Sequence, residues 1–89
     1  MESIKEVDED GTIRYRNEKG ELHREDGPAF EKPNGHKGWL INGRYHREDG
    51  PAVVWSNIEG WHYLNGKGYS KENWELEIIK IRLKRIKDL

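Results

Sequence analysis

The sequence predicts a mainly β protein of the α+β class, in which an antiparallel sheet of 23-residue hairpin repeats precedes one C-terminal helix. Three observations support this prediction. The seven residues His-Arg-Glu-Asp-Gly-Pro-Ala occur at 23–29 and again at 46–52, an offset of 23 positions. Short aromatic and β-branched segments alternate with Gly-containing turns. Residues 70–89 contain no Gly or Pro and space their apolar residues as a helix does.

The bulk composition indicates one domain with a thin core. The chain has 89 residues, 33% of them hydrophobic and 37% charged, which is more charge than a typical globular protein carries. Four Trp and four Tyr argue against disorder, because disordered segments are poor in aromatic residues. We expect one domain over residues 1–89, with the sheet over 12–69 and the helix over 70–89.

The N-terminal residues 1–11 are acidic, and we expect them to form a frayed leader outside the sheet. They lack the apolar stretch of a signal peptide. The chain has no Cys, so disulfides and thiolate metal sites are excluded. Because no apolar run reaches the roughly 20 residues needed to span a bilayer, we expect no membrane span and a cytoplasmic location.

The strands of the sheet are expected in order along residues 12–69. A fixed period of this length indicates one supersecondary unit that buries its apolar face only against its neighbours. Asn42-Gly43 and Asn65-Gly66 predict type I′ hairpin turns, which need positive φ at both central positions. The expected strands are residues 12–17, 21–25, 28–32, 38–42, 44–48, 51–56, 60–65 and 67–70.

The repeated heptad is expected to perform the same architectural task twice. In 26–28 and 49–51, Asp-Gly-Pro, the Asp is expected to cap the turn, the Gly to take an unusual φ, and the Pro to begin a strand. The Arg-Glu pairs just before these turns are expected to join neighbouring strands by charge. We interpret His23 and His46 as bridges between strands. A metal-assisted hydrolase that uses the His and Asp of each heptad remains a weaker alternative.

The C-terminal segment predicts one amphipathic helix, with Ser70 as its N-cap. Its acidic residues come early and its basic residues late, as the helix dipole favours. One apolar stripe is expected to cover the sheet and comprises Trp74, Ile78, Ile81 and Leu89. A second stripe, for which the sheet offers no obvious partner, predicts a homodimer and comprises Leu76, Ile79, Leu83 and Ile86.

Residues 39–60, WLINGRYHREDGPAVVWSNIEG, resemble a MORN-type repeat, with Trp39, Asn42, Gly43 and His46 at the matching positions. The heptad also resembles tandem repeats of uncharacterised bacteriophage proteins. The resemblance covers about residues 12–69 and implies a twisted antiparallel sheet used for interaction. It implies, more specifically, a phage protein that acts in the host cytoplasm by binding and inhibiting a bacterial factor such as a defence enzyme.

The residues therefore favour a non-enzymatic interaction protein without cofactor or metal. The sequence has no phosphate-binding loop and no nucleophile elbow. We interpret the lone histidines, His36 and His62, as surface or sheet-packing residues. Both faces of the thin sheet carry apolar residues, so part of an aromatic face is expected to be exposed and to bind a protein partner. The candidate partner-binding residues are Trp39, Trp55, Trp61 and Tyr63.

The alternative function is binding to nucleic acid or to an anionic surface through the end of the helix. The net charge of the chain is −1, so no overall attraction to nucleic acid is expected. Residues 80–87 contain five bases and no acid. The candidate anion-binding residues are Lys80, Arg82, Lys84, Arg85 and Lys87.

Overall fold

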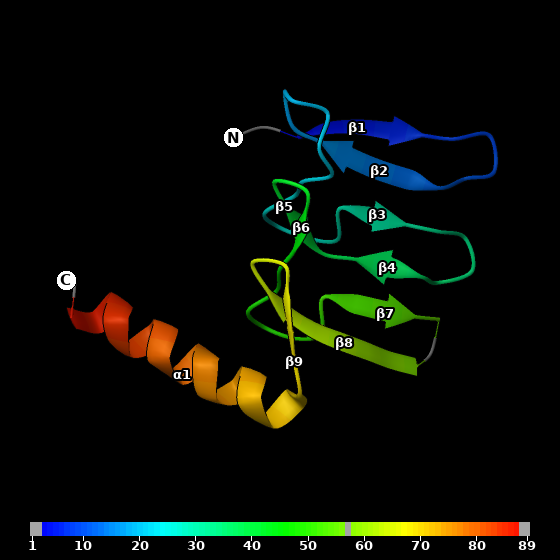
Figure 1. Ribbon diagram of the computed structural model, residues 1–89. Coiled ribbons are helices and arrows are strands. Elements are labelled where there is room, and N and C mark those ends of the chain that lie inside the picture. The colour runs from blue at the N-terminus through cyan, green and yellow to red at the C-terminus, as the bar shows by residue number, and fades with distance from the viewer. Residues whose placement is uncertain (1–2, 57, 88–89) are drawn as a thin grey trace.

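The computed structural model describes residues 3–56 and 58–87 and confirms the α+β class (Figure 1). A seven-stranded antiparallel sheet has the order β1-β2-β3-β4-β7-β8-β9, and β5 and β6 form a separate hairpin beside it. One helix follows the last strand. The elements are β1 (Ile4–Val7), β2 (Ile13–Arg16), β3 (Phe30–Glu31), β4 (Lys37–Gly38), β5 (Leu40–Ile41), β6 (Arg44–Tyr45), β7 (Val53–Trp55), β8 (Ile58–Leu64), β9 (Lys67–Tyr69) and α1 (Lys71–Lys87).

The predicted hairpin turns are confirmed by their backbone angles. Asn42 and Asn65 have φ of 48° and 52°, and Gly43 and Gly66 have φ of 80° and 84°. Gly20, one repeat earlier, has φ of 83°. Positive φ is costly for most side chains but not for Gly, and Asn tolerates it better than most residues. The 23-residue period is therefore visible in the backbone itself.

Each heptad histidine connects its repeat to the next hairpin turn. The Nδ1 atom of His23 accepts the N–H of Asn42 at 2.9 Å, and Nδ1 of His46 accepts the N–H of Asn65 at 3.0 Å. A second bond accompanies each, because the N–H of the turn glycine donates to the carbonyl of the residue before the histidine, at 2.8 Å in both repeats. The predicted bridging role of the two histidines agrees with these contacts.

The sheet begins earlier than residue 12. Residues 4–7, expected in the acidic leader, form β1 and pair with β2 in antiparallel register. Ion pairs between the two strands stabilise the hairpin: Arg16 Nε lies 2.7 Å from Glu6 Oε1, and Arg14 pairs with Asp8. In the sequence, Glu6 and Asp8 stand two positions apart, and so do Arg14 and Arg16, as on one face of a strand. The excess of acid in residues 1–11 instead favoured a leader outside the sheet.

The helix begins as predicted at the cap provided by Ser70, whose Oγ accepts the N–H of Asn73 at 3.2 Å. Trp74 and Ile78 are buried against Leu64 of β8, and Ile81 packs at the margin of this cluster. The indole of Trp74 also donates to the carbonyl of Arg47 at 3.0 Å. The first stripe therefore covers the end of the sheet, except that Leu89 lies outside the described residues.

The molecule is thin and elongated. Its extents are 45 × 30 × 17 Å, and its radius of gyration is 14.0 Å. A compact chain of this length would have a radius of gyration of about 12 Å. Two small apolar clusters replace a single core: one around Ala29, Phe30 and Leu40, the other around Trp74. No helix in the described part of the chain is long and apolar enough to cross a membrane.

Candidate functional site

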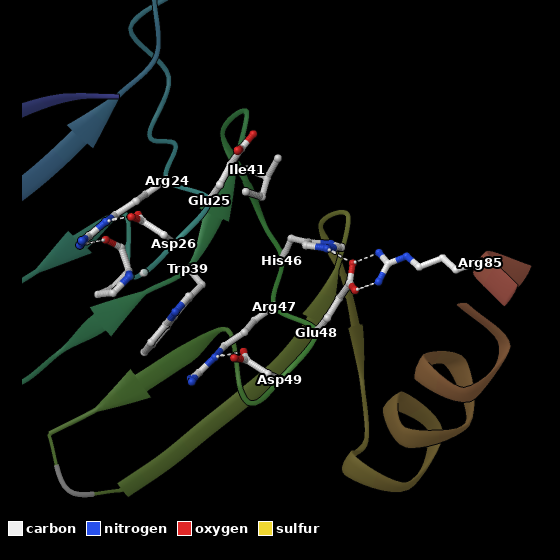
Figure 2. A pocket seen from close by; sticks show the side chains of 12 residues that line it. Arg24, Glu25, Asp26, Trp39, Ile41, His46, Arg47, Glu48, Asp49 and Arg85 are labelled. Atoms are coloured by element: carbon white, nitrogen blue, oxygen red, sulfur yellow. Dashed lines mark hydrogen bonds and ion pairs between the residues drawn. The ribbon is translucent and has the colours of Figure 1, made fainter. Parts of the chain in front are cut away.

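The two heptads lie side by side and line a groove of about 870 Å³ (Figure 2). The groove was not predicted, because sequence spacing alone does not show that successive repeats face the same side. Arg85 reaches it from the far end of α1. Its principal lining residues are Arg24, Asp26, Trp39, Arg47, Asp49 and Arg85.

The arginine of each heptad is held by contacts within its own repeat. Arg47 Nε donates to Asp49 Oδ1 at 2.8 Å and Nη1 donates to the carbonyl of Pro51 at 3.0 Å. The guanidinium carbon lies 3.8 Å from the ring centroid of Trp39, a cation–π contact. Arg24 repeats this arrangement over Tyr15 at 4.1 Å. The charge pairing expected across neighbouring strands is thus replaced, at both arginines, by a local pair with aspartate.

The glycine of each heptad has a different role from the one predicted. Gly27 and Gly50 do not have positive φ. A Cβ atom at Gly50 would lie 2.9 Å from the guanidinium carbon of Arg47, and at Gly27 it would lie 2.9 Å from that of Arg24. The prediction of an unusual φ was wrong at these positions. Glycine at these positions allows the arginine to fold directly over the turn.

The groove presents carboxylates to solvent while it covers the arginines. The side chains of Asp26 and Asp49 are 85% and 83% exposed, whereas those of Arg24 and Arg47 are 26% and 22% exposed. No group of three or more His, Asp or Glu positioned to hold a metal is found among the described residues. The side-chain contacts of the heptads are those of a structural connector.

Glu48 links the second heptad to the helix. Its carboxylate lies 2.8 Å from Arg85 Nη1 and 3.1 Å from His46 Nε2, as Figure 2 shows. The hydrogen bond from Arg85 lowers the pKa of Glu48, and His46 adds to this effect while partial burial opposes it. Because Nδ1 of His46 accepts a backbone N–H, the ring proton is on Nε2 and points to Glu48. Arg85, predicted to bind anions, is therefore engaged within the protein.

The most exposed aromatic side chains are Trp55 and Trp61, with 52% and 65% of their surfaces accessible. Trp61 lies opposite Val53 in the strand register, and Trp55 is two residues beyond Val53. Side chains two residues apart on a strand share a face. The indole of Trp55 stacks on His36 with 3.8 Å between ring centroids, and His36 packs edge-on against Phe30 at 5.0 Å. The contacts of His36 with Phe30 and Trp55 therefore hold the indole of Trp55 in place.

The other two predicted partner-binding residues are less accessible. Trp39 lies in the groove beneath Arg47, and Tyr63 packs against Tyr45 with ring centroids 5.3 Å apart. His62 is buried and lies 4.7 Å from Trp74, ring to ring. Burial, and secondly the charge of Lys32, lowers the pKa of His36. Both lone histidines pack within the sheet as predicted.

Gly60, which was not among the expected functional positions, makes the bulge between β7 and β8. The register shifts between Val53 and Val54, and a Cβ at Gly60 would lie 1.7 Å from the carbonyl oxygen of Val53. Such a bulge changes the direction of side chains along its strand. The only sequence signal was an isolated Gly beside a strand pattern.

Fold and site together define a class of protein: a β-hairpin repeat sheet, closed at one end by a helix, with an aromatic surface exposed. Comparison of the chain with models of known protein families, with curated proteins and with solved structures finds no match. The second helix stripe and the five basic residues near the end of α1 are all exposed. These residues are Leu76, Ile79, Lys80, Arg82, Leu83, Lys84, Arg85, Ile86 and Lys87.

Proposed function

We propose that this protein is a non-enzymatic interaction module that binds a protein partner through Trp55 and Trp61. The observation that supports this proposal is the exposure of both indoles on the sheet, at 52% and 65%. Tryptophan is among the residues most enriched where protein interfaces concentrate their binding energy. The support of Trp55 by His36 holds the indole in place before binding, which lowers the entropic cost of association.

The polar residues of the heptads support a structural role over a chemical one. A catalytic base must be free to reach a substrate proton. His23 and His46 each use Nδ1 to accept a backbone N–H, and Arg24 and Arg47 stack on aromatic rings. These groups connect one repeat to the next. The binding surface is therefore assigned to the aromatic residues and not to the repeated motif.

The resemblance of the heptad to phage repeats supports a narrower class of partner. It supports a phage-encoded protein that acts in the host cytoplasm, where it binds and inhibits a bacterial factor such as a defence enzyme. A small, thin sheet with exposed indoles suits binding to a larger protein, because its aromatic face offers apolar surface to a partner.

We propose that the protein also forms a homodimer through α1. The side chains of Leu76, Ile79, Leu83 and Ile86 are all more than half exposed. Their spacings of three and four residues place them along one side of the helix. Antiparallel pairing with a second copy brings the acidic first half of the helix beside the basic second half.

The alternative function, binding to nucleic acid or an anionic surface, is supported by the exposure of Lys80, Arg82, Lys84 and Lys87. Lys80 lies 3.3 Å from Glu77, and Arg85 is paired with Glu48, so the available charge is smaller than the sequence suggests. Retention on a phosphate resin, measured against salt concentration, tests this alternative. If the alternative is correct, replacement of Arg82, Lys84 and Lys87 by Gln abolishes salt-dependent retention. If the protein binds its partner through the aromatic face, the same replacement leaves partner binding unchanged.

The experiment that tests the main proposal is affinity capture from a bacterial lysate with wild-type protein and with Trp55→Ser/Trp61→Ser. The captured protein is then purified and its affinity for both forms is measured by calorimetry. We expect the double variant to weaken binding at least 100-fold while circular dichroism shows that the variant remains folded. The control is Glu18→Ser/Lys19→Ser, which replaces two exposed side chains outside the aromatic face and outside the helix stripe. A partner that binds the tryptophan variant as tightly as the wild type contradicts the proposal.

A further inference from the structure

The two ends of the seven-stranded sheet differ in their surroundings. β9 leads directly into α1, which packs against the last strands, whereas β1 lies at the opposite end of the sheet from the helix (Figure 1). No described residue forms a strand on the outer side of β1. All four residues of β1 are exposed, and Ile4 and Val7 are more than half exposed. The edge of β1 is therefore open to another chain.

The hydrogen bonds of Tyr15 show which backbone groups of β1 face this open edge. Tyr15 donates its N–H to the carbonyl of Ala29 at 2.7 Å and accepts the N–H of His23 at 2.9 Å, so both of its groups point away from β1. Lys5 is the register partner of Tyr15. Opposed residues in an antiparallel pair either exchange both bonds or neither. The N–H and C=O of Lys5 thus point outward, and by alternation so do those of Val7.

This arrangement disfavours pairing of β1 with a second copy of itself. Two antiparallel edges join through residues whose backbone groups point outward, so, among the four residues of β1, Lys5 would face either Lys5 or Val7 of the other copy. The first register places two ammonium groups opposite each other. The second places Glu6 opposite Glu6. Like charges directly opposite each other destabilise a strand pair. Natural sheets likewise carry charged residues on their edge strands, which discourage pairing with other chains.

We propose that the edge of β1 binds an extended segment of a partner protein by antiparallel strand addition. The segment carries an acidic side chain opposite Lys5, a basic side chain opposite Glu6, and apolar side chains opposite Ile4 and Val7. Read from its N-terminus, it is apolar, basic, acidic, apolar. Lys5 makes no ion pair with any described residue, whereas Glu6 is already paired with Arg16 at 2.7 Å, so the acidic position matters most.

Two synthetic peptides test the proposal by amide NMR titration of the full chain. One has Val-Lys-Glu-Ile at its centre and the other has Val-Glu-Lys-Ile, with identical Ser and Thr flanks. We expect the first to bind about tenfold more tightly, because it replaces two like-charge pairs by two opposite-charge pairs. It should also slow hydrogen exchange at the amides of Lys5 and Val7. Lys5→Glu should reverse the preference between the peptides.

Val7→Pro tests the backbone contribution, with Val7→Thr as its matched control. Because the Val7 N–H points outward, proline removes a donor for the partner but none for β2. We expect Val7→Pro to abolish peptide binding and Val7→Thr to retain it, while the Tyr15 amide signal shows that the hairpin is intact. If Val7→Pro disrupts the hairpin, the peptide pair on wild-type protein still decides the question.

Three results would overturn the proposal: equal affinity for the two peptides, unchanged binding by a folded Val7→Pro, or protection of the Lys5 amide that rises with protein concentration alone. The last result would mean that a second copy occupies the edge. The edge is separate from the aromatic face. Trp55→Ser/Trp61→Ser should leave peptide binding unchanged, so this proposal and the main function can fail independently.

Discussion

At the scale of single residues, each position of the heptad has one mechanical task. The histidine accepts the N–H of an Asn in the next turn, the arginine stacks on an aromatic ring that precedes it in the chain, and the glycine leaves room for that arginine. The three contacts occur in both copies of the heptad.

The first prediction concerns Gly60 and uses Gly20 as its control. A Cβ at Gly60 would meet the carbonyl oxygen of Val53, whereas a Cβ at Gly20 meets nothing within 4 Å and suffers only the cost of positive φ. We expect Gly20→Ala to lower the free energy of unfolding by about 1 kcal/mol and Gly60→Ala by about 3 kcal/mol or more. Urea denaturation measures both. Equal costs would mean that the bulge relaxes freely.

The second prediction concerns the two bridging histidines. His23 is 2% exposed, while His46 is 17% exposed at its side chain, so removal of His23 leaves the larger void and the more deeply buried unpaired N–H. We expect His23→Ala to cost about 2–3 kcal/mol and His46→Ala about 1–2 kcal/mol. Thermal unfolding of both variants is the measurement. A larger cost at His46 would contradict the assigned burial.

At the scale of elements, α1 is joined to the sheet at both of its ends. Near its start Trp74 and Ile78 are buried and Trp74 donates to Arg47. Near its end Arg85 reaches Glu48 in the second heptad. The ion pair is largely exposed at Arg85, so apolar burial at the first end provides most of the attachment of the helix.

The third prediction concerns the pH dependence of this ion pair. The folded pKa of Glu48 is below its ordinary value of 4.5, so the pair stabilises the fold above that pH. At pH values below 4.5, the carboxyl group of Glu48 is protonated in the unfolded chain before it is protonated in the folded chain. The stabilisation by the ion pair is therefore lost as the pH falls through the folded pKa. We expect Glu48→Gln to remove about 0.5–1 kcal/mol of stability at neutral pH and to lose less than the wild type on acidification.

The control for this prediction is Glu25→Gln at the equivalent position of the first heptad. Glu25 lies 3.8 Å from His23 and pairs with no arginine among the described residues. Chemical denaturation between pH 7 and pH 3 should therefore show the difference for Glu48 only. If Arg85→Gln has no effect on stability at neutral pH, the ion pair contributes nothing and does not cause the pH dependence.

At the scale of the whole molecule, the thin shape leaves much apolar surface uncovered. A chain of this size buries a small share of its surface on folding, and extents of 45 × 30 × 17 Å reduce that share further. The exposed stripe of α1 and the exposed tryptophans are separate areas on such a body. Association with other chains is the direct way to cover them.

The fourth prediction is that the protein dimerises through α1. Sedimentation equilibrium at micromolar concentration should give twice the mass of the 10.5 kDa chain. Leu83→Glu should return the mass to that of one chain, because it places a charge within the apolar stripe. Lys71→Gln changes the net charge by the same amount at an exposed site and should leave the dimer intact. A monomeric wild type would leave the stripe without this role.

The sequence determined what depends on neighbouring residues along the chain. The Asn-Gly turns follow from the φ that these residues tolerate, the N-cap follows from Ser70, and the period follows from the repeated heptad. These features are local, so their physical causes are visible in a few letters of sequence. The α+β class and the exposure of the second helix stripe followed from the same patterns.

Only the tertiary structure decided what depends on contacts between distant residues. The role of Gly50 depends on where Arg47 folds, that of Gly60 on the carbonyl of Val53, and that of Arg85 on Glu48, which is 37 positions away. The separation of the exposed Trp61 from the covered Trp39 has the same origin. The sequence gives the type of each residue. Its burial and its charge partners depend on which strands pack together and where the helix packs against them. Those contacts are properties of the folded chain.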